Sequence, residues 1–96
     1  MSPFKKKKLN KIRSELDKLD NILIRIIKKR TNLVKKVLVL KERKNQIIDQ
    51  KRISFILKNI KKKSLKNNID PKITYKIWKN MIYAYIDYEK RNFKKK

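Results

Sequence analysis

Two cations stand out in the first half of the chain because of where they interrupt an apolar pattern. Leucine, isoleucine and valine recur at steps of three and four over residues 9–26 and again over 33–40, but Arg30 stands where a hydrophobic residue is due. A buried cation needs an anion. Lys41 lies eleven residues on, about 16 Å along the same helical face. The two cations could enclose a small dianion, or Arg30 could set the register of a coiled coil by pairing with an acid.

Arg13 could complete such a site only from a second copy of the chain. It lies seventeen residues before Arg30, about 25 Å away along a helix, so one small ligand cannot contact both in the same chain. In an antiparallel dimer of long helices, Arg13 of one copy would approach Arg30 and Lys41 of the other, and the site would lie between subunits. The alternative is an exposed Arg13 that pairs with Asp17 four residues later.

The residue types that are missing exclude most other chemistries. The 96 residues contain no His, Cys or Gly. The sequence therefore offers no Cys or His ligands for zinc, no Ser-His-Asp or Cys-His triad, no disulfide and no glycine-rich phosphate loop. We expect no metal site.

The apolar stripe predicts one long helix over residues 6–43, the first of three in an all-α fold. At about 1.5 Å per residue this helix is over 50 Å long, too long to be covered by the rest of so short a chain. We therefore expect it to pack against a second copy. A single domain should span residues 1–96, with solvated basic tails at 1–8 and 93–96.

Two further helices follow after a break at residues 45–49. Asp49 is a predicted N-cap for the second helix, which fades over residues 61–68. Asp70 and Pro71 together predict the start of the third helix, because a capping acid precedes a proline in the first helical position. This helix should run to about residue 92.

The charge balance points to anionic partners but has a simpler explanation. Lys and Arg number 31 against 8 Asp and Glu, a formal net charge of +23. Such a charge is typical of proteins that bind nucleic acid or an anionic membrane surface. A chain rich in Lys, Ile, Asn and Tyr and poor in Gly, Ala and Pro is also what an AT-rich genome encodes, and we favour that explanation. Since Lys or Arg interrupts every apolar stretch, we expect no membrane span, no signal peptide and a cytoplasmic protein.

Taken together, these residues resemble the small all-helical chorismate mutases. The matching stretches are residues 12–20, Lys29-Arg30 with Leu33-Val34, residues 37–41, residues 49–52, and Ile69-Asp70-Pro71 leading into Ile77-Trp78. The resemblance covers residues 9–89. It implies an intertwined homodimer of three-helix chains that converts chorismate to prephenate for phenylalanine and tyrosine biosynthesis, with no covalent intermediate and no cofactor.

The resemblance also implies a role for individual residues. Arg13 of the neighbouring chain and Arg30 would clamp the two substrate carboxylates, which a guanidinium fork fits. Lys41 would contact the ether oxygen and a carboxylate. Asp49 and Arg52 would line the end of the pocket that holds the ring hydroxyl. Such a pocket selects a compact conformer and stabilises charge as the ether bond breaks, so no nucleophile is needed.

Three positions depart from the family's pattern. Ile53 replaces a glutamate that accepts a hydrogen bond from the ring hydroxyl, and Tyr85 stands where serine is usual. Glu89 replaces the glutamine that donates to the ether oxygen. It lies on the apolar stripe of the last helix and should face inward, and it must be protonated to donate. If nearby cations favour its ionised form, activity should be highest below neutral pH. The alternative is that Glu89 simply pairs with Arg52 or Arg91.

Other functions stay open at this point. Ile53 and Tyr85 also resemble the isochorismate pyruvate lyases, which produce salicylate in a similar basic pocket. A basic helical dimer that binds nucleic acid is the second alternative, but few aromatic residues lie near the lysine clusters, so stacking on bases is poorly supported. A purely structural coiled coil would leave Arg30 and Lys41 unexplained. We predict a chorismate mutase, in which Arg30→Ala abolishes turnover.

Overall fold

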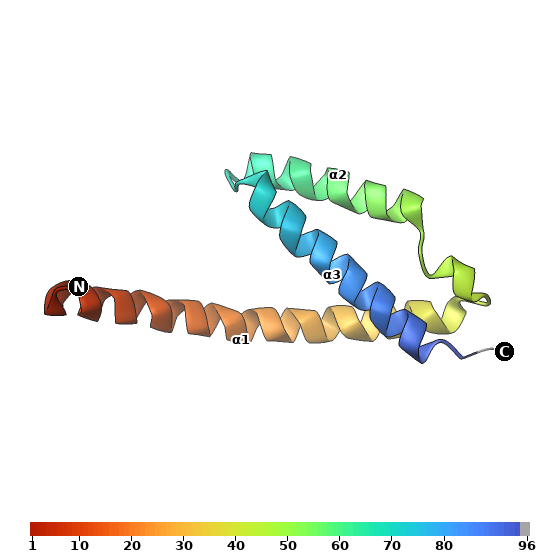
Figure 1. Cartoon of the computed structure of the whole chain (residues 1–96), viewed down its shortest axis with the longest axis horizontal. Coiled ribbons are helices and arrows are strands. Elements are labelled where there is room, and N and C mark those ends of the chain that lie inside the picture. Colours follow the sequence, from red (N-terminus) through yellow and green to blue (C-terminus); the bar gives the residue numbers. More distant parts are fainter. Residues whose placement is uncertain (95–96) are drawn as a thin grey trace. The chain divides into compact units, whose positions relative to one another are not determined.

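The computed structural model describes residues 1–94, and within them the chain is helical with no strand (Figure 1). Its elements are α1 (Pro3–Leu40), the short 3-10 helix η1 (Lys44–Gln46), α2 (Gln50–Lys66) and α3 (Pro71–Asn92). The prediction of an all-α chain with three helices, one of them very long, is confirmed. The chain divides into two compact units, Met1–Leu33 and Val34–Lys96, and each is described by itself.

The first unit is one helix whose apolar stripe remains exposed. None of the residues of α1 is buried. Between residues 12 and 33 its large hydrophobic side chains are 42% to 65% exposed, and they are Ile12, Leu16, Leu19, Ile22, Leu23, Ile24, Ile26, Ile27 and Leu33. A contiguous apolar surface of this kind is typical of a binding interface.

The helix α1 begins and ends earlier than the predicted limits of 6 and 43. Ser2 starts it, because the Ser2 hydroxyl accepts a hydrogen bond from the Lys5 backbone N–H (3.2 Å) and the Ser2 carbonyl accepts one from Lys6 (2.9 Å). Pro3 then occupies the first turn, where its missing N–H is not needed. From Pro3 onward, the residues of the predicted basic tail at 1–8 are helical and exposed.

Of the other predicted tail, at 93–96, the structure describes the first two residues. Phe93 and Lys94 follow the end of α3 without helical structure. Lys95 and Lys96 lie outside the described residues.

The turn after α1 is held by a glutamine and buries an isoleucine. The Gln46 side-chain oxygen accepts the backbone N–H groups of Glu42 (2.7 Å) and Arg43 (2.9 Å). In this turn Ile47 is 3% exposed, the most buried hydrophobic residue of positions 1–94. The predicted break at 45–49 is thus an ordered turn with a core residue in it.

The helices α2 and α3 pack against each other in the second unit (Figure 1). Both predicted caps are confirmed. The Asp49 carboxylate accepts the Arg52 backbone N–H at 3.1 Å, and the Asp70 carboxylate accepts that of Lys72 at 2.9 Å, with Pro71 at the start of α3. A helix start with a carboxylate cap is stabilised by about 1 kcal/mol.

A buried polar contact fastens α2 to α3. The hydroxyl groups of Ser64 and Thr74, 2% and 9% exposed, are 2.6 Å apart, and Ser64 also donates to the Ile60 carbonyl at 2.6 Å. Ser64 therefore accepts from Thr74. The turn between the helices contains Asn68 at a positive φ of 57°, a conformation that asparagine tolerates better than most residues. No helix among residues 1–94 is long and apolar enough to cross a membrane.

Candidate active site

A lysine and a glutamate from the two ends of the second unit's sequence meet in one contact. Lys41 Nζ lies 3.0 Å from Oε2 and 3.2 Å from Oε1 of Glu89. The two side chains are 18% and 7% exposed. Lys41 directly follows the last residue of α1, and Glu89 lies in the last turns of α3. The contact thus fixes the end of α1 against the end of α3.

The position of Glu89 confirms that it faces inward. It continues the apolar stripe that carries the buried Ile86, and it is 5% exposed. The alternative pairings with Arg52 and Arg91 are wrong. Arg91 pairs with Asp87 at 3.0 Å in an exposed contact between successive helical turns.

A half-buried ammonium group that is paired with a carboxylate can be released toward a ligand in two ways. An incoming carboxylate can compete with Glu89 for Lys41. If Glu89 is protonated, it releases Lys41 and becomes a second hydrogen-bond donor near the same point. Two donors that converge in a water-poor place stabilise an oxygen that gains negative charge.

The start of α2 holds three more of the predicted site residues. Asp49 and Arg52 are exposed, and Ile53 is half-buried. The Arg52 guanidinium lies over the Phe55 ring, 5.4 Å from its centroid. Within residues 1–94, none of these three forms an ion pair or a hydrogen bond with the Lys41–Glu89 contact.

The remaining predicted residues lie on α3 and α1. Tyr85 is half-buried, one helical turn before Glu89. Arg13 and Arg30 belong to the first unit, where both side chains are exposed on the helix. Of the predicted site residues in the second unit, Lys41 and Glu89 are in direct contact.

A cavity of about 430 Å³ lies beside Lys41, and Lys41 is the only member of the predicted set that lines it. Its lining consists of Lys35, Leu38, Val39, Lys41, Tyr88, Asn92 and Lys94. Besides Lys41, which is paired with Glu89, the lining contains Lys35 and Lys94, and these two cations favour an anion. Nothing in the sequence marks Lys35 or Tyr88 as a site residue, because neither interrupts an apolar stripe and lysine is abundant throughout the chain.

A comparison with models of known protein families decides the identity. The model described as chorismate mutase type II matches residues 12–90, most of the chain. The chain belongs to the type II chorismate mutase family. A search of curated proteins and a search of solved structures found no match.

As a chorismate mutase, the chain is an isomerase that acts on chorismate. The matched region includes every predicted site residue, from Arg13 to Glu89. The predicted activity is thereby confirmed, and neither the pyruvate lyase nor the nucleic-acid binder gains support from the comparison. This mutase carries the Lys41–Glu89 contact at the position where the resemblance implies the ether oxygen of the substrate.

Proposed function

We propose that two copies of this chorismate mutase build each active site together and convert chorismate to prephenate within it. The buried Lys41–Glu89 contact carries this proposal, because it joins two potential hydrogen-bond donors in a place where water is scarce. A dianionic substrate needs more cations than this contact supplies. We assign two further cations to the substrate carboxylates: Arg30 of the chain that carries Lys41, and Arg13 of the partner subunit.

The exposed apolar face of α1 supports the proposal that a second copy binds there. Its nine large hydrophobic side chains between residues 12 and 33 are each at least 42% exposed, which is unfavourable for a chain alone in water. An antiparallel copy of the same helix covers this stripe by symmetry, since a two-fold axis places the same surface on both sides. The same symmetry carries an arginine of one copy toward the site of the other.

The reaction needs orientation and charge rather than proton transfer. Chorismate and prephenate are isomers: a carbon–carbon bond forms as the carbon–oxygen ether bond breaks, and no atom enters or leaves. Holding both carboxylates on Arg30 and Arg13 of the partner subunit favours the compact conformer in which the two ends of the substrate are close. Bidentate guanidinium contacts suit this purpose better than lysines do.

Lys41 and Glu89 act on the ether oxygen in this proposal. Negative charge grows on that oxygen as its bond to carbon breaks, so donors placed there lower the barrier. Protonated Glu89 donates one hydrogen bond, and Lys41, released from the carboxylate, donates another to the oxygen or to a substrate carboxylate. Ionised Glu89 instead retains Lys41 and repels the growing charge.

The start of α2 forms the end of the pocket that holds the ring hydroxyl. Ile53 cannot accept a hydrogen bond, so another acceptor is needed there. Asp49 Oδ1 accepts the Arg52 backbone N–H at 3.1 Å, which leaves Oδ2 for the substrate. Arg52 fixes the direction of approach, and Tyr85 closes the pocket from α3.

Separate incubations with chorismate and isochorismate test this function. We expect the purified protein to produce prephenate from chorismate, and Arg30→Ala to lower kcat by about 10²- to 10³-fold through loss of one preorganised donor. Arg25→Ala, at another exposed arginine of α1, is the matched control and should retain activity. Salicylate from isochorismate, with no prephenate from chorismate, would contradict the proposal.

A further inference from the structure

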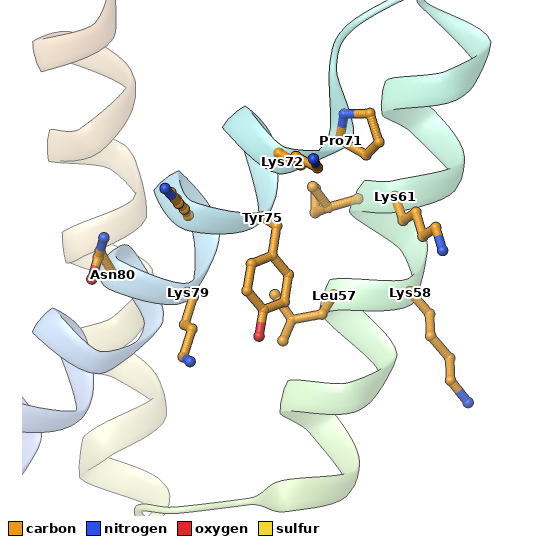
Figure 2. Close-up of a pocket in the computed structure, with 10 residues that line it drawn as sticks. Leu57, Lys58, Lys61, Pro71, Lys72, Tyr75, Lys79 and Asn80 are labelled. Atoms are coloured by element: carbon orange, nitrogen blue, oxygen red, sulfur yellow. The ribbon is translucent and has the colours of Figure 1, made fainter.

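A groove of about 880 Å³ lies between α2 and α3 (Figure 2). We call it the lysine-rimmed groove. Its apolar lining is Leu57 and Ile60 from α2 with Pro71 and Tyr75 from α3. Figure 2 shows the Tyr75 ring beside Leu57 at the centre of the groove. Lys79 Nζ lies 5.6 Å from the centroid of that ring, so the tyrosine presents a face that already holds a cation.

Five lysines surround this apolar floor, and the lining contains no carboxylate. Lys58 and Lys61 come from α2, whereas Lys72, Lys76 and Lys79 come from α3. Among residues 1–94, none of these five ammonium groups takes part in an ion pair. Their mutual repulsion is unrelieved within the chain, so a ligand that brings negative charge gains both attraction and relief of that repulsion.

We propose that the lysine-rimmed groove binds an acidic amphipathic helix of another protein. Apolar side chains of that helix would cover the floor, and its carboxylates would meet the lysines at the rim. The stretch of α3 that lines the groove, residues 71–80, is about 13 Å long. This length fits between two and three turns of a bound helix that contacts the groove through positions i, i+3, i+4 and i+7.

Two other occupants fit the groove less well. A second copy of this chain is cationic, with a formal net charge of +23, so it adds like charge to the rim. A nucleic acid supplies phosphates to the lysines but has little aliphatic surface with which to cover Leu57, Ile60 and Pro71. An acidic helix satisfies both the apolar floor and the charged rim.

The groove is separate from the proposed active site. Its lining includes none of the eight residues assigned to substrate, which are Arg13, Arg30, Lys41, Asp49, Arg52, Ile53, Tyr85 and Glu89. Substitutions at the rim should therefore leave chorismate turnover unchanged. This independence lets the proposal fail without affecting the proposed function.

The test measures binding of a fluorescent synthetic helix of about 15 residues, with leucines on one face and glutamates on the other, to the full chain. The triple variant Lys72→Gln, Lys76→Gln and Lys79→Gln should bind about tenfold more weakly, because three exposed ion pairs are lost. Tyr75→Ala should weaken binding by a similar factor of about ten, through loss of an aromatic anchor. Both variants should retain wild-type chorismate turnover, which shows that they are folded.

A charge-matched variant and two competing probes make the test specific. Lys5→Gln, Lys6→Gln and Lys7→Gln remove the same charge from the exposed start of α1 and should leave peptide binding unchanged. Equal weakening in both triple variants, or equal binding of a scrambled peptide of the same composition, would overturn the proposal in favour of general charge attraction. Tighter binding of a labelled oligonucleotide that is lost only in the groove variant would assign the groove to nucleic acid. Dissociation of an oligomer by the groove variant would assign it to an interface between copies, which also overturns the proposal.

Discussion

Glu89 and Lys41 share a contact that the reaction must rearrange. Both carboxylate oxygens of Glu89 lie within 3.2 Å of the Lys41 ammonium group. In the proposed mechanism, both side chains turn their hydrogens toward the substrate. Protonation of Glu89 allows this change, because a neutral carboxyl group holds the ammonium less strongly and gains a hydrogen to donate.

This chemistry predicts that wild type and Glu89→Gln differ in how kcat depends on pH. A glutamate can donate a hydrogen bond to the ether oxygen only in its protonated form, whereas Glu89→Gln donates one at any pH. The activity of Glu89→Gln should therefore depend less on pH than that of the wild type. The measurement is kcat for chorismate across a range of pH.

Asp87→Asn is the matched control for that experiment. Asp87 lies on the same helix and pairs with Arg91, but it is exposed and is not assigned to the site. Its variant should keep the wild-type profile. If Glu89→Gln also keeps the wild-type profile, Glu89 does not act at the ether oxygen.

Candidate site residues could be identified from the sequence where a charged residue interrupts an apolar stripe. Arg30 interrupts an apolar stripe, and Glu89 is an acid on one, so periodicity alone marks both. The Lys41–Glu89 contact itself was not predictable from spacing, because it depends on how the turn after α1 directs the chain toward α3. Lys35 and Tyr88 beside Lys41 were missed for a related reason: nothing local distinguishes a cavity-lining lysine among 31 Lys and Arg residues.

At the scale of elements, the two units bury their side chains to different extents. Between residues 12 and 33 the large hydrophobic side chains of α1 are exposed, whereas α2 and α3 bury Ser64, Thr74, Ile86 and Glu89. The helices themselves follow from apolar periodicity and from the caps Asp49 and Asp70. The predicted start of α1 missed the Ser2-Pro3 pair, although this is the same kind of signal as Asp70-Pro71. Ile47 was missed because a single apolar residue in a turn has no periodic neighbour.

The Ser64–Thr74 contact predicts a stability effect in the α2–α3 pair. Ser64→Ala leaves the buried Thr74 hydroxyl without its 2.6 Å partner and should lower the free energy of unfolding by about 1 to 2 kcal/mol. Ser54→Ala, at an exposed serine of the same helix, should change it by less than about 0.5 kcal/mol. Urea denaturation of the two variants provides the comparison. Equal effects would mean that the contact does not stabilise the pair.

At the scale of the whole molecule, two observations support the proposed second copy. The large hydrophobic side chains of α1 between residues 12 and 33 are exposed, and Arg13 lies too far along the helix from Arg30 for one small ligand to contact both in the same chain. The second copy stays a prediction from the length of the helix and the spacing of its cations. The lysine-rimmed groove was not predictable in the same way, since it depends on which lysines of α2 and α3 fall on the side where the two helices meet.

The most direct measurement of the shared site is a mixing experiment with two variants of this mutase. Arg13→Ala and Arg30→Ala should each be inactive as homodimers. After the two proteins are unfolded together and refolded, about half of the dimers should contain one copy of each. In such a dimer one of the two sites has both arginines intact, so the mixture should recover about one quarter of wild-type activity. No recovery above the separate proteins, with heterodimers shown to be present, would contradict a site built from both subunits.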